Sequence, residues 1–189
     1  PLLWEEVFLI HMCQYPLMAT IERYKHLGID KHQGHKHRNS LLEKGFIAIE
    51  PISTATARIK LMVPTAKGFQ WLKERGFDAG SSDKIGGIQH QYWARRLREQ
   101  FIKQEFSAEL EVALGKNSAV DLVVSKDKKS VGVEVETGTN SYEQMTANIR
   151  KCLEHYGRVV SFILDSSKAG KVREMARDER VAVVSTESM

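Results

Sequence analysis

Apolar residues in the first part of the chain recur at helical spacing, and the pattern then changes to alternation. It predicts three helices, a β-hairpin and a fourth helix, in that order. The helices are expected at 3–13, 18–27 and 30–44, the strands at 46–50 and 57–63 around a tip at 51–56, and the fourth helix from Thr65 onward. Asp30 and Thr65 are the expected caps of the third and fourth helices, because their side chains can accept a backbone N–H at a helix start.

The remainder of the chain shows a different order of elements. A long helix from Ile88, with Trp93 and Leu97 facing inward, leads into three strands, after which helices and strands alternate. The expected elements are strands at 108–114, 119–124 and 131–136, a helix at 141–156, a strand at 158–164, a helix at 168–178 and a strand at 181–184. The nearly continuous apolar run at 158–164 indicates a central strand. This order predicts a mixed β-sheet flanked by helices.

A stretch rich in Gly, Ser and Asp at 76–83 separates the two patterns and has the composition of a linker. We therefore expect two domains, 1–80 and 81–189. The expected fold class is α/β (α+β overall), with a small helical domain that carries a hairpin, followed by a mixed sheet flanked by helices.

The composition narrows the class of protein. Of 189 residues, 42% are hydrophobic and 28% are charged, as in a soluble globular protein with a packed core. The sequence has no run of 18 apolar residues and no signal-peptide pattern, and its two cysteines are too few for a disulfide framework or a four-thiolate zinc site. We therefore expect a cytoplasmic protein. Because the chain begins with Pro1, the sequence leaves open a missing N-terminal region, such as an ATPase.

Basic side chains concentrate on the third predicted helix and on the second strand of the hairpin. The net charge of +4 and the pI near 9.0 also favour a polyanionic partner. The residues expected to contact phosphates or base edges of DNA are Lys31, His32, Lys36, His37, Arg38, Arg58 and Lys60. The alternative is a domain that packs against a partner protein and uses these charges for solubility. A zinc site at His32 and His35 is disfavoured, since His37 would point elsewhere on the helix.

Residues 40–47 (SLLEKGFI) and 61–68 (LMVPTAKG) resemble the MarR-type winged-helix family. In that family the recognition helix ends in a leucine-rich turn with glycine, and the wing returns into a threonine-x-lysine-glycine helix start. The resemblance covers about residues 3–75. It implies a winged helix-turn-helix whose third helix enters the major groove of DNA while the hairpin lies beside it on the backbone.

Acidic side chains alternate with valines in the predicted strand at 131–136. Period-two geometry places Glu134 and Glu136 on one face and the valines on the other. Asp121 lies in the preceding strand, so hairpin pairing can bring its carboxylate beside Glu134. Three converging carboxylates repel one another unless a cation lies among them, and Mg²⁺ or Mn²⁺ binds such oxygen clusters. The alternative is a solvated face of an amphipathic hairpin.

The helix, the three-stranded meander, Asp121 in the second strand and Glu-x-Glu in the third resemble the PD-(D/E)xK, or restriction-endonuclease-like, nuclease superfamily. The resemblance covers about residues 85–185. It implies that Asp121 and Glu134 bind Mg²⁺, which activates water for hydrolysis of a phosphodiester. This chain departs from the motif at two positions, since Val120 replaces the proline and Glu136 replaces the lysine.

The glutamate in the lysine position removes a positive charge that helps to orient the water or to stabilise the transition state. Lys151 on the next helix is a candidate replacement, and Gln144 resembles the helix glutamine of some branches of the superfamily. Glu99 or Glu111 is a candidate for a fourth carboxylate. The expected catalytic residues are Asp121, Glu134, Glu136 and Lys151.

The pairing of a winged helix with a nuclease-like domain resembles DNA-processing proteins of plasmids and other mobile elements. The sequence therefore predicts a metal-dependent DNA endonuclease that binds DNA through its N-terminal domain. Two alternatives remain open: a non-catalytic replication or transcription regulator with a degenerate nuclease-like domain, and a MarR-like small-molecule sensor. A homodimer is a further arrangement that the sequence neither requires nor excludes.

Overall fold

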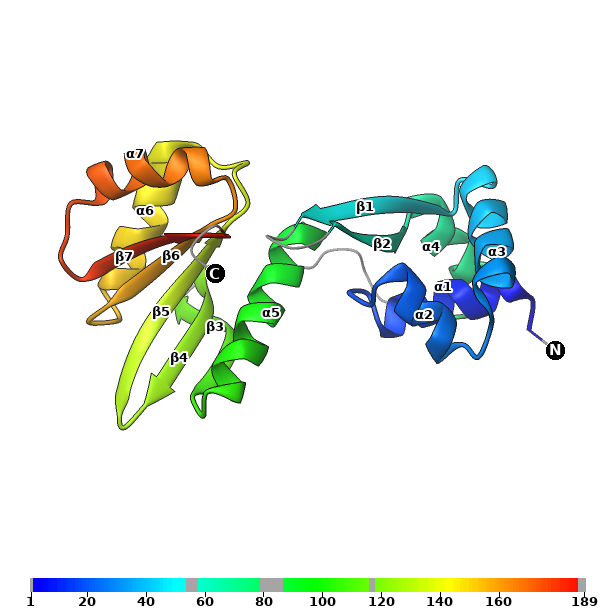
Figure 1. Ribbon diagram of the computed structural model, residues 1–189, viewed down its shortest axis with the longest axis horizontal. Helices are drawn as coiled ribbons and strands as arrows, with labels where there is room; N and C mark the ends of the chain where they lie inside the picture. Colours follow the sequence, from blue (N-terminus) through cyan, green and yellow to red (C-terminus); the bar gives the residue numbers. More distant parts are fainter. Residues whose placement is uncertain (1, 54–57, 79–86, 116–117, 187–189) are drawn as a thin grey trace. The chain divides into compact units, whose positions relative to one another are not determined.

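The computed structural model describes residues 2–53, 58–78, 87–115 and 118–186 (Figure 1). The chain forms two compact units, Pro1–Ile88 and Gln89–Met189. The expected domain boundary after residue 80 and part of the expected hairpin tip lie outside the described residues.

The first unit consists of helices and one antiparallel hairpin. Its elements are α1 (Trp4–Gln14), α2 (Thr20–His26), α3 (Lys31–Glu43), β1 (Ile47–Ser53), β2 (Arg58–Pro64) and α4 (Ala66–Lys73). Both expected caps are confirmed, since Asp30 Oδ1 accepts from Gln33 N at 2.8 Å and Thr65 Oγ1 accepts from Gly68 N at 3.2 Å. The buried core of this unit comprises Phe8, Leu9, Met12, Tyr24, Leu41, Phe46, Ile47, Met62 and Leu72.

Helix α3 packs closely on α2 at Gly34. A Cβ atom at Gly34 would lie 2.5 Å from the ring of Tyr24, which is too short for any side chain at this position. The glycine therefore allows the inner face of α3 to rest on the buried tyrosine, and the outer face is left exposed.

The second unit contains one long helix, a five-stranded sheet and two further helices. Its elements are α5 (Ile88–Lys103), β3 (Ser107–Gly115), β4 (Ser118–Lys126), β5 (Lys129–Glu136), α6 (Tyr142–Leu153), β6 (Val159–Ile163), α7 (Ser166–Ala176) and β7 (Val181–Ser185). The strand order is β3-β4-β5-β6-β7, antiparallel from β3 to β5 and parallel from β5 to β7.

Helices cover both faces of this sheet (Figure 1). On one face Trp93 of α5 packs against Phe162 of β6, with ring centroids 5.5 Å apart. On the other face Ile149 of α6 and Val172 of α7 form a buried cluster with Ile163. Phe162 and Ile163 are successive residues of one strand, so they point to opposite faces.

The predicted fold class is confirmed, with a small antiparallel hairpin and a mixed sheet flanked by helices. The apolar run predicted as a central strand is β6, which has a neighbour on each side. Helix α7 begins at Ser166, before the expected residue 168, because Asp165 caps it by accepting from Ser167 N. Among the described residues, no helix combines the length and apolar character needed to cross a bilayer.

Candidate active site

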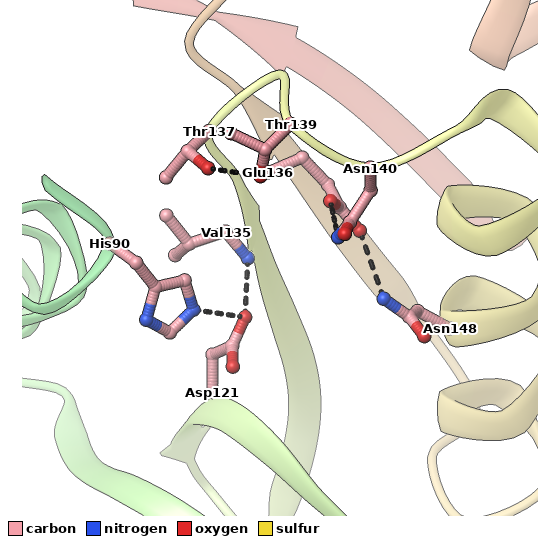
Figure 2. A network of polar contacts seen from close by, with 8 residues as sticks. All are labelled: His90, Asp121, Val135, Glu136, Thr137, Thr139, Asn140 and Asn148. Carbon is pink, nitrogen blue, oxygen red and sulfur yellow. Dashed lines mark hydrogen bonds and ion pairs between the residues drawn. The ribbon is translucent and has the colours of Figure 1, made fainter. Parts of the chain in front are cut away.

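The candidate site forms where the β4–β5 ladder ends. The two strands pair from Lys126 and Lys129 as far as Leu122 and Val133. The pairing ends there, and Asp121 and Glu134 are the next residues of the two strands. Here Asp121 Oδ2 accepts the backbone N–H of Val135 at 2.7 Å (Figure 2). The side chain of Asp121 thus takes the place of a backbone acceptor and brings its carboxylate against β5.

Glu134 is buried beside Asp121. Glu134 is 6% exposed, and its carboxyl group lies within hydrogen-bonding range of Asp121 and of the Cys152 thiol on α6. Burial raises the pKa of Glu134, and the charges of Asp121 and Glu136 raise it further. The same surroundings raise the pKa of the Cys152 thiol to about 12, first by burial and then by the nearby charge of Glu134. In the absence of a cation, these surroundings favour the protonated forms of Glu134 and Cys152.

A close approach of α6 to β5 places Cys152 at this position. A Cβ atom at Gly132 would lie 2.2 Å from the sulfur of Cys152, so glycine is required where the helix crosses the strand. Gly132 and Glu134 are two residues apart and lie on the same face of β5. The thiol consequently comes down directly beside the carboxyl group of Glu134.

Glu136 has different partners. It is 1% exposed, and its two carboxylate oxygens accept the side-chain amides of Asn140 at 2.8 Å and Asn148 at 3.1 Å (Figure 2). Gln144, expected as an accessory residue, is exposed and donates to Asn148 Oδ1 at 2.9 Å, so it reaches Glu136 only through Asn148. The structure therefore brings Asp121 and Glu134 together and holds Glu136 against Asn140 and α6.

The alternative of a solvated acidic face is wrong for both glutamates. Strand β5 is buried on both sides, since Val133 and Val135 are 1% and 4% exposed while Glu134 and Glu136 are also buried. A buried carboxylate is costly unless hydrogen bonds or a cation compensate its charge. Asn140 and Asn148 supply that compensation for Glu136.

His90 is a site residue that the sequence analysis missed. It lies in the first turn of α5, and its Nε2 is 3.0 Å from Asp121 Oδ2 (Figure 2). Burial lowers the pKa of His90, but the hydrogen bond to Asp121 and the charges of Asp121, Glu136 and Glu111 outweigh burial and raise it overall. One signal could have revealed it, since His90 shares its helix face with Trp93 and Leu97 and is a polar residue on an apolar face.

The remaining acidic and basic candidates lie on the surface. Lys151 on α6 and Glu99 on α5 are exposed, and within the described ranges neither forms an ion pair. Glu111 is also exposed and has a positive φ of 53°. It lies opposite Asp121 in the β3–β4 register, so it is the nearer of the two candidate fourth carboxylates by strand pairing.

The donor set fits a divalent cation held by few protein ligands. Among the described residues, no group of three or more His, Cys, Asp and Glu side chains is arranged to hold a metal ion. Mg²⁺ in phosphate-processing sites commonly uses one or two carboxylates and completes its shell with water and substrate oxygens. Asp121 and Glu134 meet that lower requirement. Ser161 lies opposite Glu134 on β6, and its buried Oγ has no partner among the described residues, which leaves one more oxygen donor at this point.

The basic residues expected to contact DNA fall into separate groups. Lys31, His32 and Lys36 are exposed on α3, and Arg58 and Lys60 are exposed on β2. They therefore remain available to a polyanion in the first unit.

Two other expected DNA contacts have protein partners. The half-buried ring of His37 stacks on Trp4 of α1, with centroids 4.8 Å apart. Arg38 is also half-buried, and its guanidinium donates to Asn39 Oδ1 at 2.9 and 3.2 Å. His37 thus points towards α1 and lies apart from the outer face of α3.

No family model matches this sequence, and no curated protein matches it. Solved structures that resemble the chain include a protein of unknown function, AF1548, with 12% identity and a TM-score of 0.40 over 51% of this chain and 58% of that one. A MarR protein from Peptoclostridium difficile DA00132 has 18% identity and a TM-score of 0.33 over 53% of this chain and 69% of that one. A repair endonuclease from Pyrococcus abyssi has 13% identity and a TM-score of 0.34 over 74% of this chain and 64% of that one. This chain therefore spans less than two thirds of the AF1548 protein and of the repair endonuclease.

Proposed function

We propose that this protein is a metal-dependent DNA endonuclease whose first unit binds DNA. The observation that carries the proposal is the contact of Asp121 with the buried Glu134 at the end of the β4–β5 ladder. The charge of Asp121 raises the pKa of Glu134, and a divalent cation between the two would remove that cost. The order of helices and strands around the pair also matches the order expected from the resemblance to the nuclease superfamily.

Asp121 and Glu134 would hold the Mg²⁺ or Mn²⁺ ion. When bound, the ion supplies an activated water and positive charge for phosphodiester hydrolysis. The chain itself supplies the orientation of the ligands. The N–H of Val135 fixes Oδ2 of Asp121, and Glu134 gives up its proton when the ion binds. Lys151, exposed on α6, is our candidate for contact with a substrate phosphate.

The first unit would hold DNA through exposed basic side chains on α3 and β2. Lys31, His32 and Lys36 lie on the outer face of α3, and Arg58 and Lys60 lie on the hairpin strand. Phosphate contacts of this type release counterions, so the affinity for DNA would fall steeply with salt.

Nicking of supercoiled plasmid in Mn²⁺ tests the proposal. The wild-type chain is expected to nick the plasmid, and Asp121→Ala is expected to abolish nicking while DNA binding is retained. Glu179→Ala changes an exposed acid in the turn before β7 and is the matched control, with nicking expected at the wild-type rate. Cleavage that persists in Asp121→Ala would contradict the proposal.

A non-catalytic DNA-binding regulator is the second candidate function, and the surroundings of Glu136 favour it. This glutamate occupies the lysine position of the motif and is engaged by two amides, and Lys151 forms no ion pair with it in the described part of the chain. The acidic pair thus has no lysine partner of the usual kind. Retained DNA binding with no nicking by the wild-type chain would support this function.

A further inference from the structure

We propose that His90 is a positioning residue that holds the Asp121 carboxylate in one orientation for the cation. The inference rests on the proposed function, since it concerns how a ligand of that ion is aimed. It is carried by the geometry of contacts around a single oxygen atom.

Two nitrogen donors contact the same oxygen of Asp121. Oδ2 lies 3.0 Å from His90 Nε2 and accepts the N–H of Val135 at 2.7 Å. One donor comes from a helix and the other from a strand (Figure 2). Two donors that converge on one carboxylate oxygen restrict rotation about the last side-chain bond and leave the second oxygen for another partner.

The ring of His90 is partly buried, and its Nδ1 has no hydrogen-bond partner among the described residues. The side chains of His90 and Asp121 are 15% and 18% exposed. One turn further along α5, Trp93 and Ala94 are buried against the sheet, and Trp93 packs on Phe162. The buried face of the helix therefore continues directly from His90, whose imidazole contacts Asp121 near the end of the β4–β5 pairing.

His90 and Val135 contact the carboxylate of Asp121 from different directions. The N–H of Val135 lies in the plane of the sheet and can restrain Asp121 from one side only. The imidazole approaches from the helix that covers the sheet and restrains the carboxylate from a second direction. Loss of this second donor would allow Asp121 to rotate while leaving the β4–β5 pairing intact.

Two substitutions of His90 test whether a hydrogen-bond donor at this position, and not the bulk of the ring, orients Asp121. In His90→Gln, the side-chain amide can reach the place of Nε2 and still donate to Oδ2. In His90→Asn, the amide is too short to reach it, although the residue stays polar. Gln89→Asn changes an exposed residue in the same turn and is the matched control. Thermal unfolding of the full chain confirms that each variant is folded, and His90→Leu replaces His90→Asn if the latter does not fold.

The experiment is calorimetric titration of the full chain with Mn²⁺, so the readout does not depend on catalysis. We expect His90→Asn to weaken Mn²⁺ binding about tenfold or more, as loss of an outer-shell partner commonly does. His90→Gln and the Gln89→Asn control are expected to stay within about threefold of wild type on the same scale.

The possible results distinguish this inference from the proposed function. Wild-type affinity in His90→Asn would overturn the positioning role and leave the endonuclease proposal standing. Equal loss in His90→Gln and His90→Asn would also overturn it, because the ring itself would then be required. Absence of Mn²⁺ binding in the wild-type chain would overturn both the inference and the proposed metal site.

Discussion

The two glutamates of β5 are both buried and lie two residues apart on the strand, and they have different contacts. The two carboxylate oxygens of Glu136 accept hydrogen bonds from Asn140 and Asn148. Glu134 lies beside Asp121 and Cys152, where its neutral form is favoured. We therefore expect the protonation of Glu134 to change with pH and with cation binding. For Glu136, we expect the free energy of unfolding to fall when an amide partner is removed.

The free energy of unfolding of the second unit, without metal, is expected to fall as pH rises. Burial and the charge on Asp121 raise the pKa of Glu134 above its ordinary value of 4.5, so the folded chain binds this proton more tightly than the unfolded chain. This stabilisation is complete below pH 4.5 and is lost as pH rises through the raised pKa, with a slope of up to about 1.4 kcal/mol per pH unit. Urea unfolding in the presence of a chelator measures the slope.

Glu134→Gln is the control for that pH dependence. Glutamine keeps the shape of the side chain and does not titrate, so the slope above pH 4.5 should become shallower. Saturating Mn²⁺ should flatten the wild-type slope in the same way, because the ion favours the carboxylate. An unchanged slope in Glu134→Gln would show that another group is responsible.

Asn148→Ala is expected to destabilise the second unit. It removes one of the two amides that compensate the buried Glu136, and an unsatisfied buried carboxylate oxygen costs about 1–3 kcal/mol. Gln144→Ala removes only the exposed donor to Asn148 and should cost less than about 0.5 kcal/mol. Urea unfolding compares the two variants, and equal effects would contradict this assignment of the network.

The acidic pair could be predicted from the sequence, whereas its surroundings could not. Strand alternation and hairpin pairing are local rules, and they bring Asp121 beside Glu134 without further information. The amides of Asn140 and Asn148 and the imidazole of His90 reach the site from a loop and from two helices. Their contacts depend on how each helix rotates over the sheet, which no local pattern specifies.

At the scale of the element, the sequence predicts where α3 lies but does not predict all of its contacts. Its bounds and its Asp30 cap follow from the sequence, because capping and periodicity are local. Its basic residues do not all share one face, since His37 stacks on Trp4 of α1. The indole comes from a helix distant in sequence, so the spacing of charges within α3 could not predict that contact.

Substitution of Lys36 is expected to reduce the salt dependence of DNA binding. Lys36 is exposed on α3, and Lys36→Gln removes one phosphate contact in the proposed complex. The slope of log K against log salt should become shallower by about 0.9. Lys73→Gln on α4 changes another exposed lysine and should leave the slope unchanged. Fluorescence anisotropy at several salt concentrations measures both, and equal slopes for wild type and Lys36→Gln would exclude this contact.

At the scale of the whole molecule, the two units have separate cores and should respond to pH through different groups. In the first unit, His11 Nδ1 lies 2.7 Å from Nη1 of the buried Arg23. Burial, followed by the charges of Arg23 and His26, lowers the pKa of His11 to about 4. The folded unit therefore binds this proton less tightly than the unfolded chain.

The first unit is accordingly expected to lose stability as pH falls from 6.5 towards 4. Hydrogen exchange of peptides from Pro1–Ile88 measures this loss within the full chain. His11→Asn, whose amide oxygen can take the place of Nδ1 and still accept from Arg23, should remove most of the pH dependence. Exchange that stays constant over this range in the wild-type chain would contradict the effect of His11.

The central claim is that Asp121 and Glu134 share a divalent cation. Anomalous diffraction from a crystal soaked in Mn²⁺ tests it most directly, because the signal locates the ion without reference to activity. An anomalous peak is expected between these two carboxyl groups. A fully occupied Mn²⁺ elsewhere on the second unit, with none between Asp121 and Glu134, would contradict it.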